Sequence, residues 1–131
     1  MALIPPKHDL VFAELVDRLT DRFAGAGDRN VSVEVVEPGV IAVLRDNWSL
    51  RVHWEDEPHV QAESVEIASL VAANEEDAQI IRTCRRCITT AGDADPNMLF
   101  FNDYVFVLEV LDSIPDLYIF DQNSLDIKKT E

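Results

Sequence analysis

The sequence predicts an α+β fold: an N-terminal helix packed on an antiparallel sheet of three or four strands, followed by one or two helices and a short final strand. Three patterns carry this prediction. Apolar residues recur at helical spacing near the N-terminus, they alternate with polar residues from Trp48 to Trp54, and a helix-capping sequence begins at Asn74. Hydrophobic residues make up 47% of the 131 residues, the usual share of a globular protein. We therefore expect one domain spanning 1–131.

The first helix is predicted from an apolar stripe. The residues at helical spacing are Phe12, Leu15, Val16, Leu19 and Phe23. Asp9 is the expected N-cap, and Gly25 and Gly27 are the expected end of the helix. We expect the terminal segments 1–8 and 126–131 to be flexible.

Three strands are predicted next. They cover Val31–Val35, Val40–Arg45 and Trp48–Trp54. A two-residue turn at 46–47 sets the pairs Leu50–Val43 and Val52–Ile41, which gives a continuous apolar face. Joining the first strand to this face requires an odd-length loop, such as 37–39, in which proline would be disfavoured at the middle.

The second half of the chain is expected to contain both strands and helices. The segment His59–Ser69 is predicted to be a fourth strand. A helix should begin at Asn74 and end near Gly92, because acidic residues come first in this segment and arginines later. A helix over 102–113 and a short strand over 117–120 follow.

The charge of the chain is its strongest signal. Twenty-five Asp and Glu residues stand against eleven Lys and Arg, a formal net charge of −14. Such a surface repels nucleic acid phosphates and anionic membranes, so neither is expected as a partner. It attracts a basic protein surface and accelerates the encounter with it.

One stretch concentrates the carboxylates. Eight acidic residues and no Lys or Arg lie between Glu55 and Asp77, a segment we call the acidic stretch. An ordinary solvated surface, made of a loop, a polar strand face and the first turn of a helix, is the simpler explanation of the pattern. The functional interpretation is a face that receives a cationic partner, with these contact residues: Trp54, Glu55, Asp56, Glu57, Glu63 and Glu66.

Catalytic and cofactor signals are weak. Cys84 and Cys87 form a C-x-x-C pair, but on the predicted helix they are mid-helix, which favours buried structural thiols over redox activity. These cysteines with His53 and His59 would suit zinc chemically, yet their spacing matches no familiar zinc site. No nucleophile or metalloprotease motif is present. We therefore expect no cofactor, no metal and no catalysis, and the cysteine usage favours a cytoplasmic protein.

The leading hypothesis is a non-catalytic protein that binds a basic partner. Its size, acidity and layout are similar to those of immunity proteins and antitoxins, and of small acidic chaperones that hold secreted effectors, in bulk properties alone. One alternative is a small enzyme or ligand-binding domain whose pocket lies between the aromatic C-terminal third and the sheet and contains Tyr104 or Tyr118. The other is a structural subunit that forms a homodimer through the segment 98–114.

Overall fold

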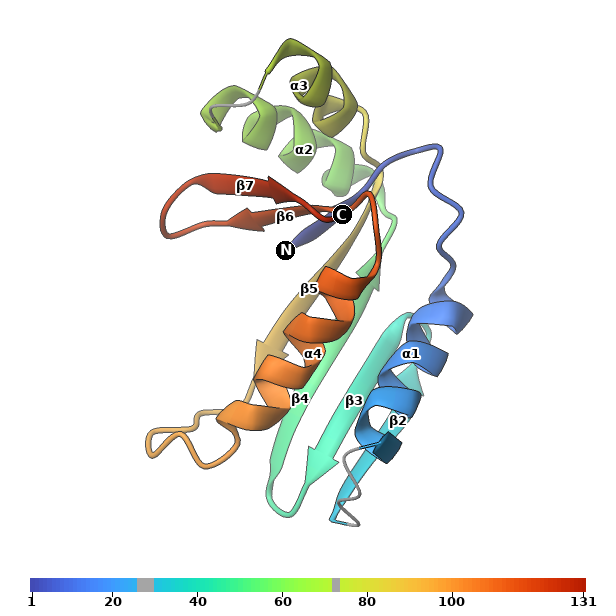
Figure 1. Cartoon of the computed structure of the whole chain (residues 1–131), viewed down its shortest axis with the longest axis vertical. Coiled ribbons are helices and arrows are strands. Elements are labelled where there is room, and N and C mark those ends of the chain that lie inside the picture. The colour runs from blue at the N-terminus through green and yellow to red at the C-terminus, as the bar shows by residue number, and fades with distance from the viewer. Residues whose placement is uncertain (26–29, 72–73) are drawn as a thin grey trace. The chain divides into compact units, whose positions relative to one another are not determined.

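The computed structural model of this chain describes residues 1–25, 30–71 and 74–131. These residues form four helices and seven strands (Figure 1). In chain order they are β1 (Ala2–Ile4), α1 (Phe12–Gly25), β2 (Val31–Glu37), β3 (Val40–Arg45), β4 (Trp48–Glu55), α2 (Pro58–Leu70), α3 (Glu75–Arg82), β5 (Arg86–Gly92), α4 (Phe101–Ser113), β6 (Tyr118–Asp121) and β7 (Asp126–Lys129).

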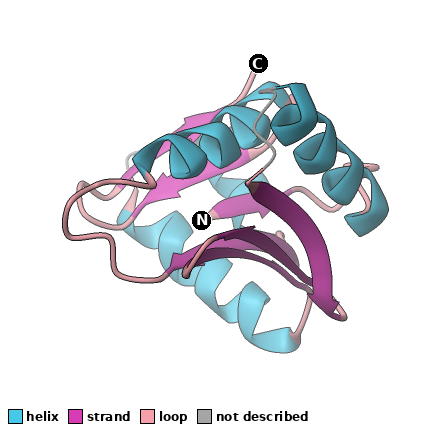
Figure 2. Ribbon diagram, turned by 90° about the horizontal axis from the view of Figure 1, so that it is seen from below, coloured by secondary structure: helices cyan, strands magenta, loops and turns pink. Residues whose placement is uncertain are grey.

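The predicted α+β class is confirmed, but the predicted number of strands is too small. The seven strands among the described residues are hydrogen-bonded in the order β2-β3-β4-β5-β1-β6-β7. The pairings β1–β5, β1–β6, β2–β3, β3–β4 and β6–β7 are all antiparallel. The longer strands are curved and twisted (Figure 2), as the right-handed twist of L-amino-acid strands requires.

The chain divides into two compact units, each built from segments that are distant in sequence. Unit 1 contains residues 1–9, 54–89 and 112–131, and unit 2 contains residues 10–53 and 90–111. The cavities considered below each lie within one unit.

In unit 2, the predicted register of β3 and β4 is confirmed. Val43 lies opposite Leu50 and Ile41 lies opposite Val52, across a turn in which Asp46 has a positive φ of 50°. In the β2–β3 hairpin, Val33 and Val35 pair with Val43 and Ile41, but not through the odd-length loop that was expected. A register shift between Val35 and Glu37 inserts one extra residue into β2. This bulge leaves a two-residue Pro-Gly turn, and bulges add the local twist that a turn of this type lacks.

The two helices of unit 2 pack against each other as well as against the meander (Figure 1). On α1, Leu15, Leu19 and Phe23 are buried, which confirms the predicted stripe. The Phe23 ring meets the Phe106 ring of α4 edge to face, with centroids 5.7 Å apart. The helix predicted over 102–113 is confirmed as α4.

The ends of α1 agree only in part with the prediction. The Val11 carbonyl accepts the first helical hydrogen bonds, from Glu14 and Leu15, so Asp9 lies too early in the chain to be the cap. The helix ends at Gly25, as expected. Gly27 lies outside the described residues.

The predicted fourth strand is wrong, because its residues form helix α2. Pro58 stands in the first turn, where a missing N–H costs nothing. The buried residues Val60, Ser64, Ile67 and Ala68 recur at helical spacing, and the Ser64 hydroxyl donates to the Val60 carbonyl at 2.9 Å.

The helix predicted from Asn74 is shorter than expected. Its cap is confirmed, since the Asn74 side chain accepts a hydrogen bond from the Asp77 amide at 2.8 Å. However, α3 ends at Arg82 and the chain becomes strand β5 at Arg86. The β-branched run Ile88-Thr89-Thr90 suits an extended strand.

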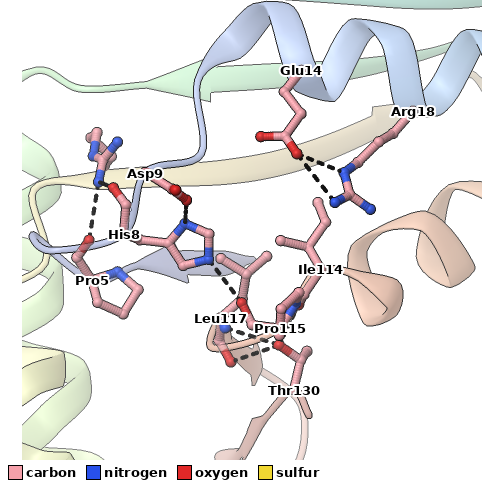
Figure 3. A network of polar contacts seen from close by, with 10 residues as sticks. Pro5, His8, Asp9, Glu14, Arg18, Ile114, Pro115, Leu117 and Thr130 are labelled. Atoms are coloured by element: carbon pink, nitrogen blue, oxygen red, sulfur yellow. Dashed lines mark hydrogen bonds and ion pairs between the residues drawn. The ribbon is translucent and has the colours of Figure 1, made fainter.

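Both ends of the chain contribute strands to unit 1, in segments that were expected to be flexible. Ala2–Ile4 is fully buried and pairs with β5 on one side and β6 on the other. Thr130, just after β7, is buried, and its hydroxyl donates to the Ile114 carbonyl at 2.5 Å and accepts from the Leu117 amide at 2.9 Å (Figure 3). Three-residue strands and end strands carry too little sequence pattern to be recognised before their partners are known.

A second set of polar contacts fixes the segment that follows β1. The His8 ring Nε2 lies 2.8 Å from the Pro115 carbonyl (Figure 3), and the Arg86 guanidinium donates to the carbonyls of Pro5 and His8. Arg86 therefore holds the backbone of unit 1 through hydrogen bonds to two carbonyls.

Candidate functional site

A groove in unit 1 brings part of the acidic stretch together with apolar side chains. It has a volume of about 340 Å³ and lies between α2 and the β6–β7 hairpin. We call it the acidic groove. It is lined by Met1, Glu63, Glu66, Ile67, Leu70, Phe120, Gln122 and Leu125.

The α2 side of the groove follows from helical spacing. Glu63, Glu66, Ile67 and Leu70 stand at i, i+3, i+4 and i+7, so they share one face of α2. Ile67 is buried, whereas half of Leu70 remains exposed. The helix therefore presents two carboxylates beside an apolar strip.

The opposite side is formed by the hairpin. Phe120 of β6 is buried, and Leu125 in the turn keeps 44% of its surface exposed. Leu125 has φ 57°, a left-handed conformation that costs a leucine about 1 kcal/mol and that glycine or asparagine adopts more easily. An exposed apolar side chain in a strained turn is the kind of local conflict that accumulates at functional sites.

The groove carboxylates form no ion pair with a cationic side chain among the described residues. Within residues 1–25, 30–71 and 74–131, the side chains of Glu63 and Glu66 make no hydrogen bond or ion pair. The lysines of β7 pair with other carboxylates: Lys128 with Asp112 and Lys129 with Asp116, each at 3.7 Å.

Unit 2 shows the opposite pattern. Arg18 pairs with Glu14 at 3.2 Å, Arg22 pairs with Glu109 at 2.9 Å, and Arg45 pairs with a carboxylate of α4 at 2.7 Å. These three arginines neutralise acidic residues of their own unit, and the acidic stretch of unit 1 has no Lys or Arg partner of this kind among the described residues.

The other predicted contact residues lie at the junction of β4 and α2. Glu55 and Glu57 lie 4.0 Å and 3.6 Å from the His59 ring, and Asp56 between them is exposed. Trp54 is half-buried and does not line the acidic groove. The structure therefore brings Glu63 and Glu66 into one groove and gathers Glu55 and Glu57 around His59.

The apolar half of the groove was not predicted from the sequence. Ile67 belongs to a segment interpreted as a strand, and Leu70 follows that segment. On a strand, Ile67 would share a face with Glu63 but not with Glu66, so the four residues would not have formed one surface. Counting the helical spacing of the four residues would have found them. Leu125 has no sequence signal, because its position depends on how β6 and β7 pair.

The two cysteines are buried and free. Burial raises the pKa of both the Cys84 and the Cys87 thiol to about 12. Cys84 follows the C-terminal end of α3, so no helix N-terminus is available to activate it. Their predicted burial is confirmed, but the predicted mid-helix position is wrong, because Cys84 lies in the loop after α3 and Cys87 in β5.

Neither a metal-binding cluster nor a membrane-spanning helix occurs among the described residues. No group of three or more His, Cys, Asp or Glu residues there is arranged to hold a metal ion. None of the helices formed by these residues has the length and apolar composition needed to cross a membrane.

Unit 2 contains a different kind of cavity. It has a volume of about 350 Å³, and aromatic residues, among them Tyr104, form much of its wall.

Comparisons with protein families, curated protein sequences and solved structures find no match for this chain.

Proposed function

We propose that this chain is a non-catalytic protein-binding protein that recognises a basic partner, and that the acidic groove is its contact surface. One observation carries the proposal: Glu63 and Glu66, which form no ion pair with a described side chain, lie beside apolar side chains, of which Leu70 and Leu125 are about half exposed. Partners of immunity proteins, antitoxins and effector chaperones are the class of basic protein that this proposal implies.

The groove suits an amphipathic cation. Lysine and arginine have aliphatic stems that lie along apolar surfaces while their charged ends reach outward. Such a side chain can place its stem on Ile67 and Leu70 and its charge beside Glu63 or Glu66. A neighbouring apolar residue of the partner would then cover Leu125 and Phe120.

The test uses synthetic peptides as probes of this chemistry. We expect a peptide of alternating lysine and leucine to bind the wild-type protein, a lysine–serine peptide to bind more weakly, and a glutamate–leucine peptide not to bind. Calorimetric titration at two salt concentrations measures this. The affinity for the lysine–leucine peptide should fall as salt rises, because exposed charge pairs are screened.

Comparison of two double variants, each of which replaces two glutamates with glutamine, locates the binding site. Glu63→Gln/Glu66→Gln should weaken lysine–leucine binding by about tenfold and flatten its salt dependence. Glu34→Gln/Glu37→Gln removes the same two charges from the exposed β2 strand of unit 2 and should leave the affinity within about twofold. Equal losses in the two double variants would show that only the net charge matters, and the acidic groove would be rejected as the contact surface.

A further inference from the structure

The cavity of unit 2 has a lining that differs from that of the acidic groove and shares no residue with it. Its wall comes from β4, the end of β5, the loop before α4 and the first turn of α4. The lining residues are Trp48, Leu50, Thr90, Gly92, Asp93, Asp95, Met98, Phe100, Phe101 and Tyr104.

Four aromatic rings surround this space in a fixed arrangement. Trp48 is buried and stacks on Phe100, with centroids 5.0 Å apart and planes 11° from parallel. Its indole N–H donates to the Asp93 carbonyl at 3.1 Å, which orients the ring. Phe101 and Tyr104 remain partly exposed, with centroids 6.5 Å apart.

The two carboxylates of the lining are held only by neutral donors. Asp95 accepts hydrogen bonds from the amides of Leu99 and Phe100, at 2.8 and 3.0 Å. Asp93 accepts from the amide and the hydroxyl of Ser49, both at 3.0 Å. These bonds fix the side chains in place, and neither carboxylate forms an ion pair with another part of the chain that the structure describes.

No cationic side chain of the lining competes for that charge. The lining contains no Lys, Arg or His, and the sequence has none from Cys87 to Ile127. Gly92 adds no side chain to the space, and a Cβ there would lie in van der Waals contact with Leu50 Cδ1 at 3.4 Å and Trp48 Cζ2 at 3.5 Å. The cavity therefore combines aromatic faces, negative charge and room for a small group.

We propose that this cavity binds an alkylated ammonium cation, either as a free small molecule or at the end of a modified lysine side chain. Aromatic ring faces attract cations through their quadrupoles, and this attraction is strongest when the cation gives up water easily. Methyl groups lower the hydration of an ammonium and contact the rings directly. The volume is at the small end of the range for ligand pockets, which suits a ligand of this size.

The test compares a cation with its uncharged analogue. Choline and 3,3-dimethyl-1-butanol have the same shape, but only choline carries a charge. We expect choline to bind about tenfold more tightly, measured by calorimetry and by the fluorescence of Trp48. Equal affinities for the two compounds, or no binding of choline, would overturn the proposal.

Variants test the wall of the cavity. Tyr104→Leu and Gly92→Val should each weaken choline binding by about fivefold or more, the first by removing a ring and the second by filling space. Leu108→Ala, on the same helix but outside the lining, should not change it. Unchanged affinity in both cavity variants would show that choline binds elsewhere and would also overturn the proposal.

A peptide arm separates the two sources of the cation. A peptide with trimethyllysine that binds more tightly than choline, and much more tightly than its unmethylated form, assigns the cavity to a modified protein. Tighter binding of choline assigns it to a free ligand. A concentration-dependent dimer that is lost in Tyr104→Leu would instead make these aromatic residues a self-association surface and would contradict the proposal.

Discussion

At the scale of single residues, buried polar groups of this protein are matched to their partners. Asp103 has a side chain that is only 3% exposed, and the Arg45 guanidinium donates to both of its oxygens, at 2.7 and 3.0 Å. A bidentate pair of this kind is strong while it is intact. Loss of one partner leaves the other charge without compensation in a poorly hydrated place.

The first prediction concerns this ion pair. Asp103→Ala should lower the free energy of unfolding by about 3 kcal/mol, because Arg45 then remains desolvated without its carboxylate. The double variant Arg45→Met/Asp103→Leu should recover most of the loss, since a hydrophobic pair avoids the desolvation cost. Urea denaturation measures both.

The exposed pair Glu14–Arg18 provides the control. Both side chains are more than a third exposed, so Arg18→Ala should cost less than about 1 kcal/mol. A loss for Asp103→Ala no larger than the loss for Arg18→Ala would contradict the account of a desolvated pair.

The second prediction concerns the thiols. Because burial raises their pKa from an ordinary value of 9.0 to about 12, Cys84 and Cys87 keep their protons in the folded state at neutral pH. An aromatic disulfide reagent at pH 8 should therefore label neither thiol in the folded protein and both thiols in denaturant. Rapid labelling without denaturant would contradict their burial.

The same pKa values give the direction of a stability change with pH. Above pH 9 the unfolded chain loses thiol protons that the folded protein keeps until about pH 12, so the free energy of unfolding should fall across this interval. The buried Tyr118, whose pKa is raised by burial and by its hydrogen bond to Asp77, adds to the fall at its upper end. Cys84→Ala/Cys87→Ala should show a shallower fall than the wild type, and an equal slope would exclude the thiols as its cause.

At the scale of elements, the sequence was informative where an element has a complete local pattern. The stripe of α1, the alternation in β4 and the cap of α3 each contain their own evidence, and each is confirmed. The segment 58–70 was misassigned because Val60, Val65 and Ile67 are β-branched, which suggests a strand. Its helical spacing and Pro58 outweigh that preference once the face of α2 is buried.

Other elements depend on partners that are distant in sequence. The strand β1 has only three residues and lies between β5 and β6. Its sequence is too short to show a strand pattern, so it is recognised only from its pairing with these two strands. The α3-to-β5 transition was missed because Cys84 and Cys87 fit a helical pattern that continues from α3. The acidic half of the candidate groove was predicted from charge, and its apolar half required the correct assignment of α2.

The third prediction concerns the β6–β7 turn. Leu125→Asn should raise the free energy of unfolding by about 0.5–1 kcal/mol, since asparagine adopts a positive φ with less strain than leucine. It should also weaken binding of the lysine–leucine peptide, because one of the exposed apolar side chains of the groove is lost. Asp46→Asn, at the positive φ in unit 2, should change neither property. A fall in stability for Leu125→Asn would make Leu125 an ordinary packing residue.

At the scale of the whole molecule, the charge is both large and unevenly compensated. A net charge of −14 draws a basic partner from a distance and speeds association, and salt screens this effect. Long-range attraction does not choose an orientation by itself. On our account, orientation comes from the acidic groove, where two carboxylates that form no ion pair with a described side chain lie beside exposed apolar side chains.

Charge reversal in the acidic groove tests this claim most directly. Calorimetric titration of the Glu63→Lys/Glu66→Lys variant with the lysine–leucine and glutamate–leucine peptides should show the first affinity lost and the second gained, since the apolar strip remains and only the sign of the charge changes. If the variant still binds the lysine–leucine peptide as tightly as the wild type and does not bind the glutamate–leucine peptide, recognition does not occur in this groove.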